Sequence, residues 1–104
     1  MCTREVDGKL EILLITRGHE PNLGCLAFPG GHIDYNEDPK DAAVWELREE
    51  TGIEGSEPRL VTARGEPTRD ARKHMITIVY EIRVDPTAEP KAADDAASAA
   101  WYDV

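Results

Sequence analysis

The sequence predicts a mixed α/β or α+β domain, in which several strands form a sheet and one helix packs against it. Two observations support this fold class: short apolar and β-branched runs recur along the chain, and one segment, 38–51, carries clear helix boundary signals. The 104 residues fit a single domain, residues 1–104, because no Pro-rich or Ser/Gly-rich linker divides the chain. A single helix cannot cover both faces of such a sheet.

The strands are predicted from composition and from the turns that bound them. The first run is rich in Leu and Ile and follows a turn at Asp7-Gly8, and the longest is rich in Ile, Val, Thr and Tyr. The predicted strands are 9–17, 26–28, 59–63, 75–84 and 101–104. The stretch 86–100, made mostly of Ala, Asp, Glu, Lys and Pro, is expected to be a surface loop.

The predicted helix has a start signal and a stop signal. Asp38 can accept hydrogen bonds from the free amides of the first turn, and Pro39 has the backbone angle that the first helical position requires. Asp41 adds favourable negative charge near the helix start. Gly52 is expected to end the helix in a left-handed conformation.

The formal net charge of −9, from 21 acidic and 12 basic residues, argues against a nucleic acid or an anionic membrane as the partner. No apolar run approaches the roughly 20 residues that span a bilayer, and no secretory signal follows Met1, so a cytoplasmic location is expected. Cys2 and Cys25 have no metal-ligand spacing and are interpreted as reduced structural thiols, of the kind that behave as small buried hydrophobes.

Three carboxylates mark one face of the predicted helix. Glu46, Glu49 and Glu50 stand at i, i+3 and i+4, and none of their helical neighbours at i±3 or i±4 is Lys or Arg. A solvated surface helix is the alternative, but such helices usually carry compensating cations. Crowded carboxylates favour a shared hard cation, Mg²⁺ or Mn²⁺. Gly30-Gly31, ahead of the helix, permits an unusual backbone conformation or a close approach to another group.

These features together resemble a known family. Gly31, five residues, Glu37, seven residues and then Trp45 to Ile53 look like the Nudix box, here residues 31–53, and all but one of its defining positions match. The resemblance implies a Nudix-like α/β/α sandwich with a mixed β-sheet, whose final C-terminal helix is missing from this chain. It also implies that Glu46, Glu49, Glu50 and the Gly30 carbonyl bind metal and that the three glutamates serve catalysis. Glu37, Gly31 and Gly52 would support the site.

The one departure from the box is Trp45, which stands where the family has arginine. An arginine there would pair with Glu49 at i+4 and hold it for the metal, and Trp cannot make that bond. Its loss is expected to weaken metal affinity or turnover by about 10- to 100-fold. Alternatively, Arg48 or another arginine compensates.

The implied reaction is metal-assisted attack of water on a pyrophosphate. The base is Glu46 or Glu50, or one of the loop residues Glu66, Asp94 and Asp95. Arg17, Arg69 and Arg72 are candidate phosphate contacts.

The segment 66–72 is similar to a loop of Nudix ADP-ribose pyrophosphatases, which implies AMP and ribose 5-phosphate as products, with Phe28 or Tyr80 stacking on adenine. The alternatives are a hydrolase of (d)NTPs or dinucleoside polyphosphates, and a non-catalytic domain that binds a nucleotide or ADP-ribose. The expected partner is a small-molecule nucleotide, with no nucleic acid and no membrane, and the sequence allows a homodimer.

Overall fold

The fold begins with a β-hairpin formed by β1 (Cys2–Val6) and β2 (Lys9–Arg17), which pair antiparallel from Cys2↔Leu13 to Val6↔Lys9. Asp7 and Gly8 connect them with φ angles of 51° and 79°, as a two-residue hairpin turn requires. The bounds of β2 confirm the prediction. The turn was predictable from the sequence, but β1 was not, because Thr3, Arg4 and Glu5 lack an apolar strand pattern. The computed structural model describes residues 1–20, 22–67, 74–94 and 96–104.

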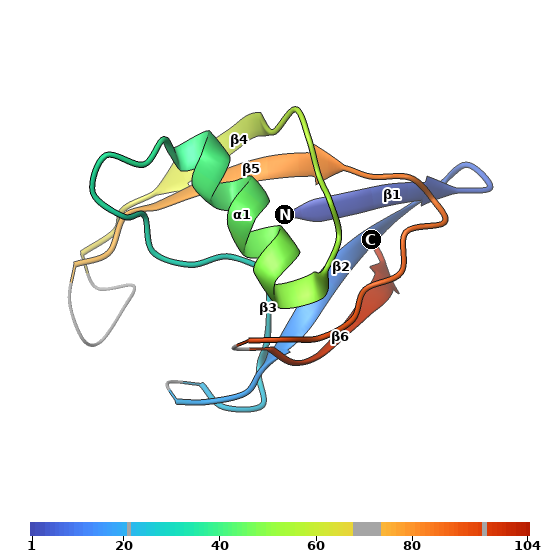
Figure 1. Cartoon of the computed structure of the whole chain (residues 1–104), viewed down its shortest axis with the longest axis horizontal. Helices are drawn as coiled ribbons and strands as arrows, with labels where there is room; N and C mark the ends of the chain where they lie inside the picture. Colours follow the sequence, from blue (N-terminus) through green and yellow to red (C-terminus); the bar gives the residue numbers. More distant parts are fainter. Residues whose placement is uncertain (21, 68–73, 95) are drawn as a thin grey trace.

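The other strands extend this hairpin into one mixed sheet (Figure 1). They are β3 (Leu26–Ala27), β4 (Arg59–Arg64), β5 (Thr77–Arg83) and β6 (Ala96–Asp103). The strand order is β3-β2-β1-β5-β4, with β6 paired to β2. The β1·β5 pair is parallel, whereas the other pairs are antiparallel. The predicted mixed α+β class is therefore confirmed.

Strand β6 corrects the expectation of a surface loop up to residue 100. It begins at Ala96 and pairs with β2 from Arg17↔Ala96 to Glu11↔Asp103. Alanine has a low intrinsic preference for strands, but pairing with the apolar strand β2 outweighs that preference. Local composition could not predict this, because the partner strand is about eighty residues away in the sequence.

Helix α1 (Pro39–Thr51) has the predicted bounds and caps. The Asp38 Oδ1 atom accepts a hydrogen bond of 2.9 Å from the Lys40 N–H at the helix start. Gly52 ends the helix at φ 73°, and its N–H donates to the Arg48 carbonyl at 2.8 Å. No helix in the described ranges is long and apolar enough to cross a membrane.

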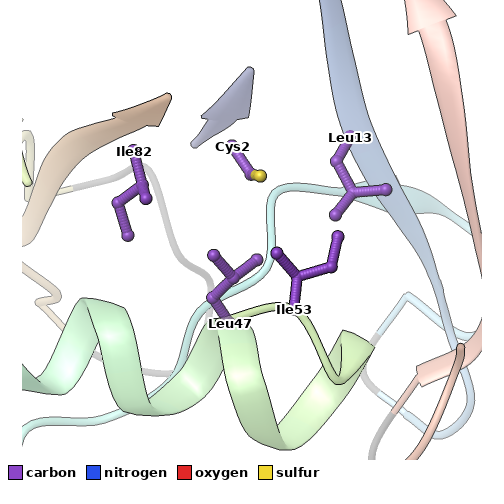
Figure 2. Close-up of a cluster of buried hydrophobic side chains, with 5 residues drawn as sticks. All are labelled: Cys2, Leu13, Leu47, Ile53 and Ile82. Carbon is purple, nitrogen blue, oxygen red and sulfur yellow. The ribbon is translucent and has the colours of Figure 1, made fainter. Parts of the chain in front are cut away.

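The hydrophobic core lies between α1 and one face of the sheet. Figure 2 shows Cys2, Leu13 and Ile82 pointing from the sheet toward Leu47 and Ile53. The Cys2 side chain is buried, and burial raises the pKa of its thiol to about 11, so the structural interpretation of this cysteine is confirmed. Cys25 is exposed, so its interpretation as a buried hydrophobe is wrong.

Helix α1 covers one face of the sheet, and the part of the chain that the structure describes contains no second helix. The described residues therefore do not form the second helical layer of an α/β/α sandwich. The core that does form is enough to fix α1 against β1 and β5, which determines where the carboxylates of the helix lie.

Candidate functional site

The three helical glutamates differ in exposure although they share one face of α1. Glu50 is only 4% exposed, whereas Glu46 and Glu49 are half-buried. They lie within one turn of the helix, so their charges repel one another. Helical spacing places all three on one face, and Leu47, between them in sequence, packs into the core.

The loop before the helix contacts two of these glutamates. In this glycine loop (residues 29–31), the Gly30 N–H donates a 2.7 Å hydrogen bond to Glu50 Oε1. Gly31 lies against Glu46, because a Cβ added at Gly31 would be 2.5 Å from the Glu46 Cδ atom. Neither glycine has a positive φ angle. The sequence allowed the glycine pair either an unusual backbone conformation or a close approach to another group. The structure shows the close approach, and Gly31 is the residue that makes it.

Between the glycine loop and the helix, Glu37 closes a tight turn. Its Oε1 atom accepts a 3.0 Å hydrogen bond from the Asp34 N–H, and its own N–H donates to the Asp34 carbonyl at 3.0 Å. Asn36 adopts the positive φ of 65° that the turn requires, which is tolerated better by Asn than by most residues. Glu37 thus stabilises the loop through both of its bonds to Asp34.

The donor chemistry of the site suits a hard divalent cation, because it consists of carboxylates and backbone carbonyls. The side chains have not converged, however: within the described ranges, no three His, Cys, Asp or Glu side chains are grouped closely enough to hold an ion. Glu50 is instead bonded to the Gly30 N–H, and Glu46 lies along Gly31. The residues fit such an ion by type and by their spacing along the helix.

Arg48 lies beside Trp45 on α1. The Trp45 ring is 48% exposed, and the Arg48 guanidinium lies 5.6 Å from its centroid. Arg48 Nε is 3.4 Å from the Glu54 carboxylate. The alternative that Arg48 replaces the missing arginine is therefore wrong, because Arg48 interacts with Trp45 and Glu54 and makes no bond to Glu49.

The other candidate residues that the structure describes are Arg17, Glu66 and Asp94. Arg17 ends β2 and is half-buried. Glu66 is exposed and pairs with Arg64 at 3.0 Å. Asp94 is exposed and has a left-handed φ of 54°. Arg69, Arg72 and Asp95 lie outside the described residues.

The two aromatic side chains considered for adenine stacking differ in exposure. Phe28 is exposed, whereas Tyr80 on β5 is half-buried.

Sequence reasoning missed a segment that contacts the end of the helix. The Lys91 N–H donates to the Thr51 carbonyl at 2.8 Å, and the Ala93 N–H donates to the Glu50 carbonyl at 3.0 Å. These bonds use acceptors that a helix C-terminus otherwise leaves without a partner. No side-chain type signals such a contact, because every residue except proline carries a backbone N–H.

A second buried glutamate lies on the sheet. Glu81 is 8% exposed and, because side chains alternate along β5, it lies on the face opposite Ile82 and the helix. Its carboxylate accepts hydrogen bonds from Arg59, from Thr3 Oγ1 at 2.8 Å and from Arg83 at 3.2 Å. These bonds, that from Arg59 above all, lower the pKa of Glu81 to about 2.

The sequence is similar to those of known proteins. The family model described as the NUDIX domain matches residues 2–104. An ADP-ribose pyrophosphatase of Methanocaldococcus jannaschii is 41% identical over 103 residues, which are 95% of this chain and 60% of that protein. The chain therefore spans less than two thirds of this curated relative.

Solved structures show the same fold. A MutT/nudix family protein from Enterococcus faecalis superposes with a TM-score of 0.91 at 28% identity, covering 98% of this chain and 40% of that one. The NUDIX domain of Shewanella oneidensis NrtR complexed with ADP ribose has a TM-score of 0.86 at 25% identity, covering 98% of this chain and 68% of that one.

Proposed function

Since this chain belongs to the NUDIX domain family, we propose that it is a divalent-metal-dependent pyrophosphohydrolase whose substrate is ADP-ribose. The observation that carries the proposal is the contact of the glycine loop with the carboxylate face of α1, through Gly30 to Glu50 and Gly31 to Glu46. Loop and helix thereby form one oxygen-rich site. The 41% identical relative is an ADP-ribose pyrophosphatase, and a similar NUDIX domain is complexed with ADP ribose, which supports this substrate.

In the proposed reaction, water attacks one phosphorus of the pyrophosphate, the bridging P–O bond breaks, and AMP and ribose 5-phosphate leave. Glu46, Glu49, Glu50 and the Gly30 carbonyl would hold Mg²⁺ or Mn²⁺, which supplies positive charge to neutralise the pyrophosphate oxygens. Glu46 or Glu50 accepts the proton of the attacking water, with the exposed Glu66 and Asp94 as alternatives. Arg17, at the end of β2, is proposed to contact a phosphate.

The proposal is tested by hydrolysis of a substrate panel. Purified protein is incubated with ADP-ribose, with dNTPs and with dinucleoside polyphosphates, each with Mg²⁺, with Mn²⁺ and with a chelator. We expect AMP and ribose 5-phosphate from ADP-ribose with metal, and no product with chelator. Preferential cleavage of a dNTP or a dinucleoside polyphosphate would refute ADP-ribose as the substrate but would still support metal-dependent pyrophosphate hydrolysis.

A non-catalytic ADP-ribose binder is the second candidate. It is favoured by Trp45, which replaces the arginine expected to hold Glu49, and by the likeness to a NUDIX domain complexed with ADP ribose. Calorimetric titration with ADP-ribose separates the two candidates. Saturable binding without any product in the panel would establish the binder and refute the enzyme.

A further inference from the structure

Glu50 is held from two sides. Its carboxylate accepts the Gly30 N–H at 2.7 Å, and its backbone carbonyl accepts the Ala93 N–H at 3.0 Å. The next carbonyl, that of the fully buried Thr51, accepts the Lys91 N–H at 2.8 Å. Segments far apart in the sequence, the glycine loop and residues 91–93, therefore meet at this one residue of α1.

The segment that provides Ala93 is itself fixed to the sheet. Arg4 on β1 donates to the carbonyls of Pro86 at 3.0 Å and Ala88 at 3.3 Å. Trp101 on β6 also donates to the Ala88 carbonyl, at 3.1 Å, and its ring lies 4.4 Å below the Arg4 guanidinium. The stretch from residue 86 to residue 93 thus connects β1 and β6 to the end of the helix.

We infer that the Ala93 N–H is a positioning group for Glu50, and that residues 86–93 form a brace that fixes where the Glu50 carboxylate lies relative to Glu46 and Glu49. This inference rests on the function proposed above. The carboxylate is joined to the backbone by a short side chain, so a displacement of the last helical turn displaces the carboxylate with it. Misplacement by about 1 Å can lower the rate of a catalytic site by about 100-fold.

The chain offers a matched pair for the test, because two alanines are adjacent in the brace. The Ala93 N–H donates to Glu50, whereas no backbone hydrogen bond of the Ala92 N–H is present in the part of the chain that the structure describes. Replacing either alanine by L-lactate converts its N–H into an ester oxygen and keeps the methyl side chain. The Ala92 ester therefore controls for the ester itself in the full-length protein.

Two quantities are measured for the wild type and both esters: the Kd for Mn²⁺, from the electron paramagnetic resonance signal of free Mn²⁺, and kcat and KM for ADP-ribose. We expect the Ala93 ester to raise the Kd for Mn²⁺ and lower kcat by about tenfold each, which is the scale of losses outside the direct ligands. KM should change by less than about twofold, because the expected change concerns Glu50 and not the substrate contacts. The Ala92 ester should match the wild type.

Thermal unfolding of both esters separates positioning from stability. If the Ala93 ester lowers Tm but keeps the Kd for Mn²⁺ and kcat of the Ala92 ester, the inference is overturned, and equal losses in both esters overturn it too. If the wild type hydrolyses nothing yet the Ala93 ester alone weakens Mn²⁺ binding, the brace stands while the proposed function fails.

Discussion

Among the described residues two glutamates are buried, Glu81 and Glu50, and their surroundings differ in kind. Glu81 lies between Arg59 and Arg83 on the sheet, with Thr3 donating to the same carboxylate. Glu50 accepts a backbone N–H and stands within one helical turn of Glu46 and Glu49. The Glu81 charge is hydrogen-bonded to two arginines. The Glu50 charge belongs to a group of neighbouring carboxylates, which is the arrangement that a bound cation stabilises.

The strongest test of this comparison replaces each buried glutamate by glutamine. Glu50→Gln keeps an oxygen for the Gly30 N–H and removes one repelling charge, so we expect unchanged or higher stability. Its kcat should fall by about 10³-fold, the scale of losing a proton acceptor or metal ligand. Glu81→Gln should keep kcat within about twofold, since Glu81 faces away from α1.

Kinetics at 25 °C and urea unfolding of both variants check these expectations. Glu81→Gln should lower the free energy of unfolding by about 2 kcal/mol, because two arginine hydrogen bonds to a buried charge are weakened. The comparison fails if Glu50→Gln destabilises the protein and Glu81→Gln inactivates it.

The low pKa of Glu81 predicts a loss of stability in acid. The pKa is lowered from 4.5 to about 2 in the folded chain, chiefly by Arg59, so the unfolded chain takes up the proton first as the pH falls. The contribution of the ionised Glu81 carboxylate to the free energy of unfolding is complete above pH 4.5, declines between pH 4.5 and 2, and is lost below that. This contribution is about 3 kcal/mol at its full size, at 1.36 kcal/mol per pKa unit.

Urea unfolding of the wild type and Glu81→Gln between pH 6 and pH 2 measures this contribution. The difference in the free energy of unfolding between the wild type and Glu81→Gln should shrink as the pH falls through that range. Glu5→Gln is the matched control, because Glu5 is an exposed carboxylate 3.7 Å from the same Arg83 and should change stability little at any pH. Parallel curves for the wild type and Glu81→Gln would refute the assignment.

The comparison also shows what the sequence could and could not predict. The bounds of α1 were predictable because Asp38, Pro39 and Gly52 act on adjacent backbone groups. The carboxylate face was predictable because helical spacing alone places Glu46, Glu49 and Glu50 on one face. By contrast, the surroundings of Glu81 depend on pairing between β1, β4 and β5, and neither β1 nor the start of β6 has a local strand signal.

Within the site, the parts that escaped prediction are contacts between segments distant in the sequence. The glycine pair suggested a special backbone or a close approach, and only the structure shows that Glu46 lies against Gly31. The same holds for the bond from Ala93 to Glu50. Arg48 is adjacent to Glu49 in sequence, but a step of one residue turns the helix by about 100°, and Arg48 lies beside Trp45 and Glu54 instead.

The smallest expected effect comes from an arginine placed beside Glu49. In Trp45→Arg, the new guanidinium stands four residues before Glu49 and can pair with it. Holding Glu49 in place should lower the Mn²⁺ concentration for half-maximal activity by up to about tenfold. Stability should change by less than about 1 kcal/mol, because a half-exposed ring and its contact with Arg48 are exchanged for a surface ion pair.

Mn²⁺ titrations of activity compare this variant with Trp45→Gln, which removes the ring without adding charge. If Trp45→Gln strengthens Mn²⁺ activation as much as Trp45→Arg, the bulk of the tryptophan is the cause and the missing charge is not. If neither variant differs from the wild type, Glu49 is already held in its working position, and an arginine at position 45 adds nothing to it.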